Sequence, residues 1–138
     1  MTGKIDYINP PGTGPAQGLY SHVARVPAGT LLFIAGQLSV GRSGEVVGKG
    51  DFERQFHQVF ENLGAVLAGM QIGWGDIARF TTYLVHSQDI EIFMRARAAL
   101  FPNLFPGGRQ PPNTLLVVDR LVKEDFLLEV EAIARAKD

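Results

Sequence analysis

Two glutamates near the C-terminal end of the 138-residue chain are the side chains whose type and spacing most directly suggest chemistry. Glu129 and Glu131 lie in the segment from Phe126 to Ala134, whose alternation of apolar and other residues predicts a strand. Side chains alternate along a strand, so both carboxylates share one face and lie roughly 6–7 Å apart. On a dry face the pair needs a cation, or one member keeps its proton. On a solvated face they are ordinary surface charges, and the residues alone leave both readings open.

The familiar catalytic and ligand-binding motifs are missing from the sequence. It contains no dinucleotide-binding or Walker glycine motif, no H-E-x-x-H and no G-x-S-x-G. The absence of cysteine excludes disulfides and thiolate chemistry. The three histidines, His22, His57 and His86, lack ligand spacing, so we expect neither a metal site nor another cofactor. His57 sits between Glu53 and Glu61 at helical spacing, which is typical of a solvated helix face.

Length and composition predict one domain spanning residues 1–138. Hydrophobic residues make up 46% and charged residues 20%, with a formal net charge of −1. No cluster of lysines and arginines supports binding to nucleic acid. No apolar run reaches membrane-spanning length, and the N-terminus lacks a secretory core. We therefore expect a soluble cytoplasmic protein that binds neither nucleic acid nor membrane.

Strands and two helices must position these residues. Strand-like segments lie at residues 20–26, 30–40, 77–85, 110–118 and 126–134. Asp51 is expected to cap a long amphipathic helix, and Ser87 or Asp89 a second one. The order β-β-α-β-α-β-β predicts an α+β domain, a mixed sheet of five to six strands with both helices on one face. The other face, which carries the glutamate pair, then has no helix to cover it, and a subunit interface would cover it.

The chain resembles the Rid family, also called the YjgF/YER057c/UK114 or L-PSP family, along nearly its whole length. No single matching segment is very specific, but their order and spacing together are. The matching segments are Gly18-Leu19-Tyr20-Ser21, Ala35-Gly36-Gln37-Leu38, Gly44-Glu45-Val46-Val47, Asn62–Leu67, Thr81–Leu84 and Glu129–Ala134.

The resemblance implies a chorismate-mutase-like fold, assembled as a homotrimer that binds a small molecule in clefts between subunits. Family members of known activity hydrolyse reactive enamines and imines, such as 2-aminoacrylate, to keto acids and ammonia without a cofactor. An arginine clamps the substrate carboxylate, a glutamate positions the attacking water, and a tyrosine and a glycine-glutamine strand line the cleft. By position the glutamate corresponds to Glu129, the tyrosine to Tyr20, and the strand to Gly36 and Gln37.

The arginine is where the sequence departs from the family. The family's deaminases read P-A-R-S, whereas this chain reads Pro111-Pro112-Asn113-Thr114. Asn113 carries no charge and cannot form the two-pronged pair with a carboxylate. Arg109 is either a substitute that reaches back from a glycine-rich loop or a solvated loop cation. On sequence alone, restoring the clamp by Asn113→Arg is expected to raise activity on carboxylate-bearing imines.

Two functions of different classes remain. The first is a hydrolase of C=N bonds, with Glu129 as base and with Tyr20, Asn113, Thr114 and the strand at Gly36 lining the substrate site. The second is a non-catalytic trimeric module that binds or senses a small metabolite. The ribonuclease label of similar proteins is a weak third option, since the basic patch is missing. A cation beside Asn113 would favour the enzyme, and its absence a neutral ligand.

Overall fold

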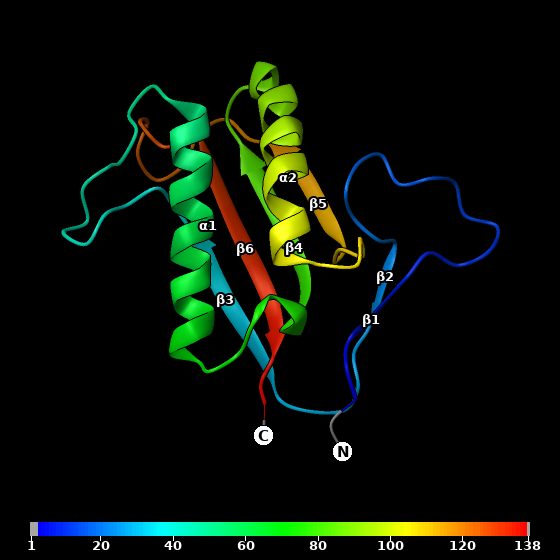
Figure 1. Ribbon diagram of the computed structural model, residues 1–138. Coiled ribbons are helices and arrows are strands. Elements are labelled where there is room, and N and C mark those ends of the chain that lie inside the picture. The colour runs from blue at the N-terminus through cyan, green and yellow to red at the C-terminus, as the bar shows by residue number, and fades with distance from the viewer. Residues whose placement is uncertain (1–2, 138) are drawn as a thin grey trace.

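A computed structural model describes residues 3–137 as helices packed on a sheet, with a small strand pair beside them (Figure 1). The helices are α1 (Phe52–Gly69) and α2 (Ile90–Leu104), and short 3-10 helices at Trp74–Asp76 and Ser87–Asp89 precede β4 and α2. The strands are β1 (Asp6–Ile8), β2 (Val23–Arg25), β3 (Leu31–Gln37), β4 (Ile77–Leu84), β5 (Asn113–Val117) and β6 (Leu128–Arg135).

The main sheet has the strand order β3-β6-β4-β5. Strand β6 runs antiparallel to both of its neighbours, whereas β4 and β5 are parallel and are joined through α2. The sheet is therefore mixed, and α2 forms the crossover between parallel neighbours that the element order predicted. The mixed sheet with two helices confirms the predicted α+β class.

The number of strands in the main sheet differs from expectation. Residues 3–137 form six strands, but within them β1 and β2 pair only with each other, antiparallel, and leave four strands in the main sheet. The proline- and glycine-rich segment at residues 9–22 connects these two strands as a loop, which we call the N-terminal loop. The pair is tied to the main sheet by the buried Tyr7, whose hydroxyl donates a 2.7 Å hydrogen bond to the carbonyl of Ile77.

Helix α1 forms as its sequence pattern predicts. The Asp51 side chain accepts a 3.0 Å hydrogen bond from the backbone N–H of Arg54, which satisfies one of the free donors at the helix start. Its apolar stripe is buried against the sheet and includes Phe56, Val59 and Leu63, none of which is exposed. Helix α2 has Asp89 at its N-cap position, but no side-chain hydrogen bond caps it.

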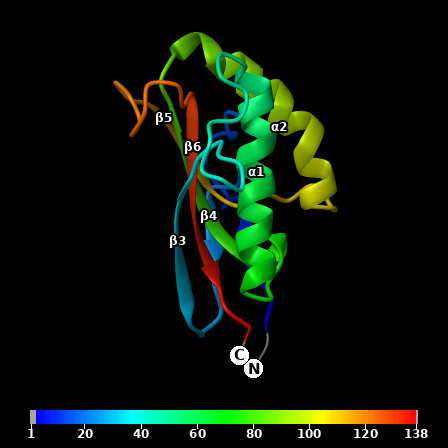
Figure 2. The same ribbon diagram turned by 90° about the vertical axis from the view of Figure 1, so that its left-hand side faces the viewer.

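Both helices cover the same side of the main sheet, as the view along the sheet shows (Figure 2). We call the opposite side the open face. Its large apolar residues are exposed: Phe33 is 75% and Leu31 45% accessible. Apolar area of this kind without a covering element indicates an interaction surface. Among residues 3–137, no helix is long and apolar enough to cross a membrane.

Candidate functional site

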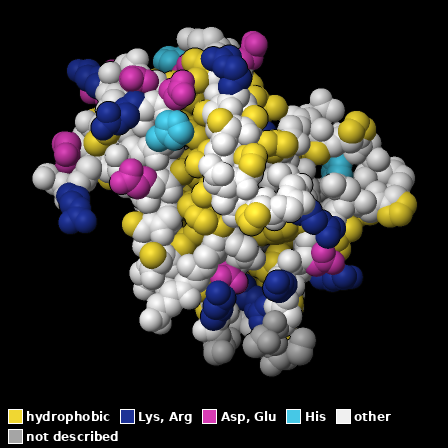
Figure 3. All heavy atoms as spheres, in the orientation of Figure 1, with side chains coloured by type: hydrophobic (Ala, Val, Ile, Leu, Met, Phe, Trp, Pro, Cys, Tyr) yellow, Lys and Arg dark blue, Asp and Glu magenta, His cyan; other side chains and the backbone are white. Residues whose placement is uncertain are grey.

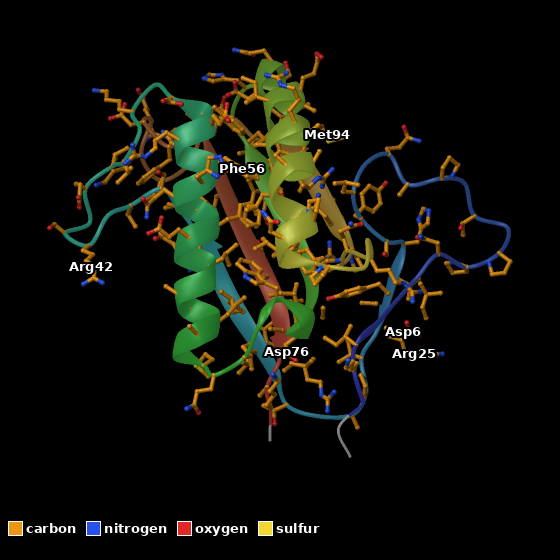
Figure 4. The ribbon with its side chains drawn as sticks, in the orientation of Figure 1. Asp6, Arg25, Arg42, Phe56, Asp76 and Met94 are labelled. Atoms are coloured by element: carbon orange, nitrogen blue, oxygen red, sulfur yellow. The ribbon has the colours of Figure 1, made fainter. Side chains whose placement is uncertain are left out.

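A cavity of about 570 Å³ lies between α2, the edge strand β5 and the N-terminal loop. Its polar lining comes from four separate parts of the chain, and no aspartate or glutamate of residues 3–137 contributes to it. The lining residues are Gln17, Tyr20, Ser21, His22, Arg79, Ile90, Met94, Arg97, Pro112, Asn113, Thr114 and Leu115. Figure 4 labels Met94 on the side of α2 toward the N-terminal loop.

The cavity reaches around both sides of the edge strand. Asn113 pairs with the buried Phe80 in the neighbouring strand and so shares the helix side of the sheet. Thr114 pairs with Thr81 and lies on the open face. There its hydroxyl accepts a 3.0 Å hydrogen bond from the Arg79 guanidinium. The cavity is therefore continuous with the surface that the helices leave uncovered.

Tyr20 is held inside the cavity by its own loop. Its hydroxyl oxygen accepts a 3.1 Å hydrogen bond from the backbone N–H of Gln17, so its own proton remains free to be donated. The ring meets His22 edge-on, with 6.2 Å between ring centroids. A ring nitrogen of His22 lies 2.7 Å from the carbonyl oxygen of Gly14, which secures the loop on itself.

Asn113 presents a donor to the cavity. The hydroxyl of Thr82 donates a 2.7 Å hydrogen bond to the Asn113 side-chain oxygen. Thr82 is buried, so this bond is shielded from water and fixes the orientation of the amide. The amide nitrogen has no hydrogen-bond partner among residues 3–137 and remains available to a ligand.

Two arginines line the same cavity, and the sequence analysis identified neither. Arg79 is exposed on the open face, whereas Arg97 of α2 is only 3% accessible. Burial lowers the pKa of Arg97 to about 10, and nearby Tyr20 acts in the opposite direction, so the side chain is charged at neutral pH. The sequence does indicate that Arg97 is buried. It falls four residues after Phe93 and four before Phe101, inside the apolar stripe of the helix.

Arg109, the substitute cation considered from the sequence, lies elsewhere. It lines a second cavity of about 610 Å³ together with Lys4, Asp6 and Arg25. Its guanidinium donates a 2.6 Å hydrogen bond to the carbonyl of Tyr7 and lies 3.8 Å from the Asp6 carboxylate. Charged side chains of both signs gather at this end of the molecule (Figure 3), and Asp6 and Arg25 lie side by side in Figure 4.

Glu129 lies on the open face rather than in the cavity lining. Gly36 packs directly against it, and a Cβ atom added to Gly36 would overlap the Glu129 carboxylate. The glycine in this strand is therefore required for close approach. It lies where the register between β3 and β6 shifts, and Gln37 at the strand end folds back to the carbonyl of Ala35 at 3.1 Å.

The two glutamates differ in their surroundings although both are half-buried. Glu131 accepts a 2.6 Å hydrogen bond from the hydroxyl of Tyr83, and this bond, together with burial, raises the pKa of Tyr83. Burial, followed by the charge of Glu131, raises the pKa of Glu129. Glu129 accepts no hydrogen bond from residues 3–137, so its carboxylate is free to bind a proton.

Within one chain the expected site residues other than Arg109 thus form two groups. Tyr20, Asn113 and Thr114 line the cavity, whereas Glu129 and Gly36 lie together on the open face. In residues 3–137, no group of three or more His, Cys, Asp or Glu side chains is arranged to hold a metal ion.

Residues 12–136 match the family model described as Endoribonuclease L-PSP. The chain belongs to the Rid (YjgF) family. It is 37% identical over 118 residues to a RutC family protein of Pyrococcus horikoshii, covering 85% of this chain and 86% of the relative. A RutC family protein of Synechocystis is 32% identical over 110 residues, covering 79% and 81% of the two chains.

Solved structures of Rid proteins have the same fold. The Rid family protein YyfB of Yersinia pestis, described as being of unknown function, superposes with a TM-score of 0.84 at 31% identity, covering 96% of this chain and 98% of YyfB. E. coli TdcF with bound serine gives a TM-score of 0.69 at 26% identity, covering 99% and 100% of the chains. The YjgF/L-PSP fold expected from the sequence is therefore confirmed.

Proposed function

We propose that this Rid protein is a cofactor-independent hydrolase of small imines or enamines that carry an anionic group, acting in clefts between the copies of a homotrimer. The observation that carries the proposal is the presence of two arginines in the cavity that holds Tyr20 and Asn113. Position 113 lacks its arginine, but the cavity still contains positive charge. A carboxylate-bearing substrate of the 2-aminoacrylate type is thereby favoured over a neutral one.

The trimer brings the two groups of site residues together. The open face carries Glu129 and exposed apolar side chains such as Phe33, and a second copy would bury them. The cavity reaches this face at Thr114 and Arg79, so a partner's Glu129 can meet a ligand that Tyr20 and Asn113 hold. The clefts of such an assembly are the sites of the small-molecule ligand.

The chemistry needs one base and no metal-bound or organic cofactor. Glu129 removes a proton from water while the water oxygen bonds to the carbon of the C=N group. The imine nitrogen takes up a proton in the same step. The C–N bond of the resulting carbinolamine then breaks, and ammonia leaves a carbonyl product. The raised pKa of Glu129 brings its basicity closer to neutral pH, where a general base works best.

A metabolite-binding module without turnover is the second candidate. The structure of TdcF with bound serine favours it, because that Rid protein holds a small amino acid. The two candidates share the cavity and differ only in the role of Glu129.

Release of keto acid from enzymatically generated amino-acid imines tests the proposal. The wild-type protein is expected to accelerate release above the uncatalysed rate. Glu129→Gln, which keeps the shape of the side chain but removes the base, is expected to lower kcat by about 100-fold or more. Wild-type protein that binds ligand without accelerating release would support the binding module instead.

A further inference from the structure

We propose that Arg97 of α2 is the residue that binds the anionic group of the ligand, a carboxylate, and that it takes over the role of the arginine missing at position 113. The inference rests on the proposed function for the substrate class and adds the residue that recognises it. Its first support is a missing partner: the Nε and Nη1 atoms of Arg97 are buried and have no hydrogen-bond partner among residues 3–137.

The groups that Arg97 does contact are only weak hydrogen-bond acceptors. Its Nη2 atom lies 3.1 Å from the sulfur of Met94, and its guanidinium carbon lies 4.9 Å from the centre of the Phe93 ring. No carboxylate in the described part of the chain lies within ion-pair distance of it. Buried arginines are nearly always paired, because an unpaired charge away from water is costly. The buried guanidinium is therefore set up for an anion that comes from outside the chain.

The N-terminal loop is shaped to lie against this guanidinium. A Cβ atom on Gly18 would overlap Nη2 of Arg97 and come within 2.9 Å of the Met94 side chain. Gly18 also has a φ of +152°, which non-glycine residues seldom adopt. The glycine thus lets the loop that carries Tyr20 close over Arg97 and places both side chains in one cavity.

Two polar side chains that share the cavity with Arg97 present donors to it. The Asn113 oxygen is already satisfied by Thr82, which leaves the amide N–H groups. The Tyr20 oxygen accepts from Gln17, which leaves the hydroxyl proton. No acidic residue of the described part of the chain lines the cavity, which therefore offers a ligand positive charge together with N–H and O–H donors. This set matches an anion and rejects a cation.

A carboxylate fits better than a phosphate. Arg79, the other arginine of the lining, is exposed on the open face and donates to the Thr114 hydroxyl. At the buried side of the cavity the Arg97 guanidinium supplies a single positive charge in a planar fork, which matches the charge and the plane of a carboxylate. The apolar part of the lining includes Ile90, Met94 and Leu115, and Met94 contacts Arg97 directly. A doubly charged anion would leave one charge uncompensated there.

Calorimetric titration with pyruvate tests the assignment without requiring turnover. Wild-type protein is expected to bind pyruvate more tightly than inorganic phosphate or the neutral analogue pyruvamide. Arg97→Met should weaken pyruvate binding about tenfold or more. The matched control is Arg95→Met, the same change at an exposed position of the same helix, which should bind as wild type. Adding Asn113→Arg to the Arg97→Met protein should restore binding.

Thermal unfolding separates ligand binding from a structural role. Removing an unpaired buried charge should leave the melting temperature of Arg97→Met equal to or above that of wild type. The proposal is overturned if Arg97→Met melts lower and the double variant does not recover binding, or if wild-type protein prefers phosphate or does not bind pyruvate. It is equally overturned if Arg97→Met binds pyruvate as wild type does. A protein that binds pyruvate through Arg97 but releases no keto acid would contradict the proposed hydrolase and leave the anion site standing.

Discussion

The hydroxyl of the buried Thr82 donates a 2.7 Å hydrogen bond to the side-chain oxygen of Asn113. This bond sets which end of the amide meets the cavity. With the oxygen satisfied inside the sheet, the nitrogen is the end that faces a ligand, and the residue acts as a donor beside Arg97. Asn113, at the position where the resemblance implies an arginine, therefore keeps donor character, and in our proposal Arg97 of α2 supplies the charge.

Thr82→Val tests this relationship. The change keeps the side-chain shape but leaves the Asn113 oxygen without its donor, so the free energy of unfolding should fall by about 1–2 kcal/mol. The freed amide can also turn its oxygen toward the ligand, and pyruvate affinity should fall severalfold. Denaturant unfolding and calorimetry measure the two effects. Thr81→Val on the open face is the control, and equal losses in both variants would contradict the account.

Gln55 supports the fold in a way that a single substitution can reveal. Its buried side chain donates to the carbonyls of Gly48 and Asp125 and accepts from the N–H of Leu127. Gln55→Leu leaves the Asp125 carbonyl and the Leu127 N–H without partners, whereas the Gly48 carbonyl still accepts from the N–H of Asp51. The free energy of unfolding should fall by about 2–4 kcal/mol. Gln58→Leu, one turn later on the same helix, should cost less, and an equal cost would argue against this role.

Gly36→Ala should separate catalysis from binding. A methyl group at this position would overlap the Glu129 carboxylate and displace it. Keto-acid release should therefore fall about tenfold or more, by the loss of a positioned base, while pyruvate affinity changes little. Gly69→Ala is the control, because a Cβ atom there meets nothing within 4 Å. A Gly36→Ala protein with wild-type activity would show that catalysis does not depend on where the Glu129 carboxylate is held.

Glu129 also gives stability a defined pH dependence. Its pKa is raised in the folded state, so the folded protein holds this proton more tightly than the unfolded chain does. Ionising Glu129 therefore destabilises the folded protein. This destabilisation is absent below the ordinary glutamate pKa of about 4.3 and complete once the pH exceeds the pKa of Glu129 in the folded state. Glu129→Gln should thus unfold at a higher temperature than wild type at pH 7, with the difference shrinking as the pH falls toward 4.

The control for this pH effect is Glu61→Gln, which changes an exposed glutamate on α1. Its melting temperature should follow that of wild type at every pH. A Glu129→Gln protein that melts below wild type at pH 7 would show that the carboxylate stabilises the folded state rather than straining it.

The local parts of the fold could be predicted from the sequence because short-range rules determine them. Asp51 caps α1 through a bond to a residue three positions away, and β6 shows its buried face by simple alternation. The division of six strands into four and two depends on pairing between distant segments, such as Asp6 with Arg25. No local pattern specifies that pairing.

The residues of the candidate site were harder to predict from the sequence. Arg109 is four residues from Asn113 along the chain, yet its guanidinium binds the carbonyl of Tyr7. Arg97 is far from Asn113 in sequence and lines the same cavity. The structure therefore changes the expectation for Asn113→Arg: in the wild-type background we now expect less than about a threefold gain, because Arg97 already supplies the charge.

Mixing two impaired variants tests the central claim most directly. If Glu129 of one copy completes the cavity that holds Arg97 of another, the Glu129→Gln and Arg97→Met proteins are each about tenfold or more less active than wild type when assayed alone at low substrate concentration. Co-assembled at equal amounts, they should recover about a quarter of wild-type keto-acid release, the fraction of clefts that receive both intact residues. Mixed assemblies that form but stay inactive, or a wild-type protein that light scattering shows to be a monomer, would contradict the account.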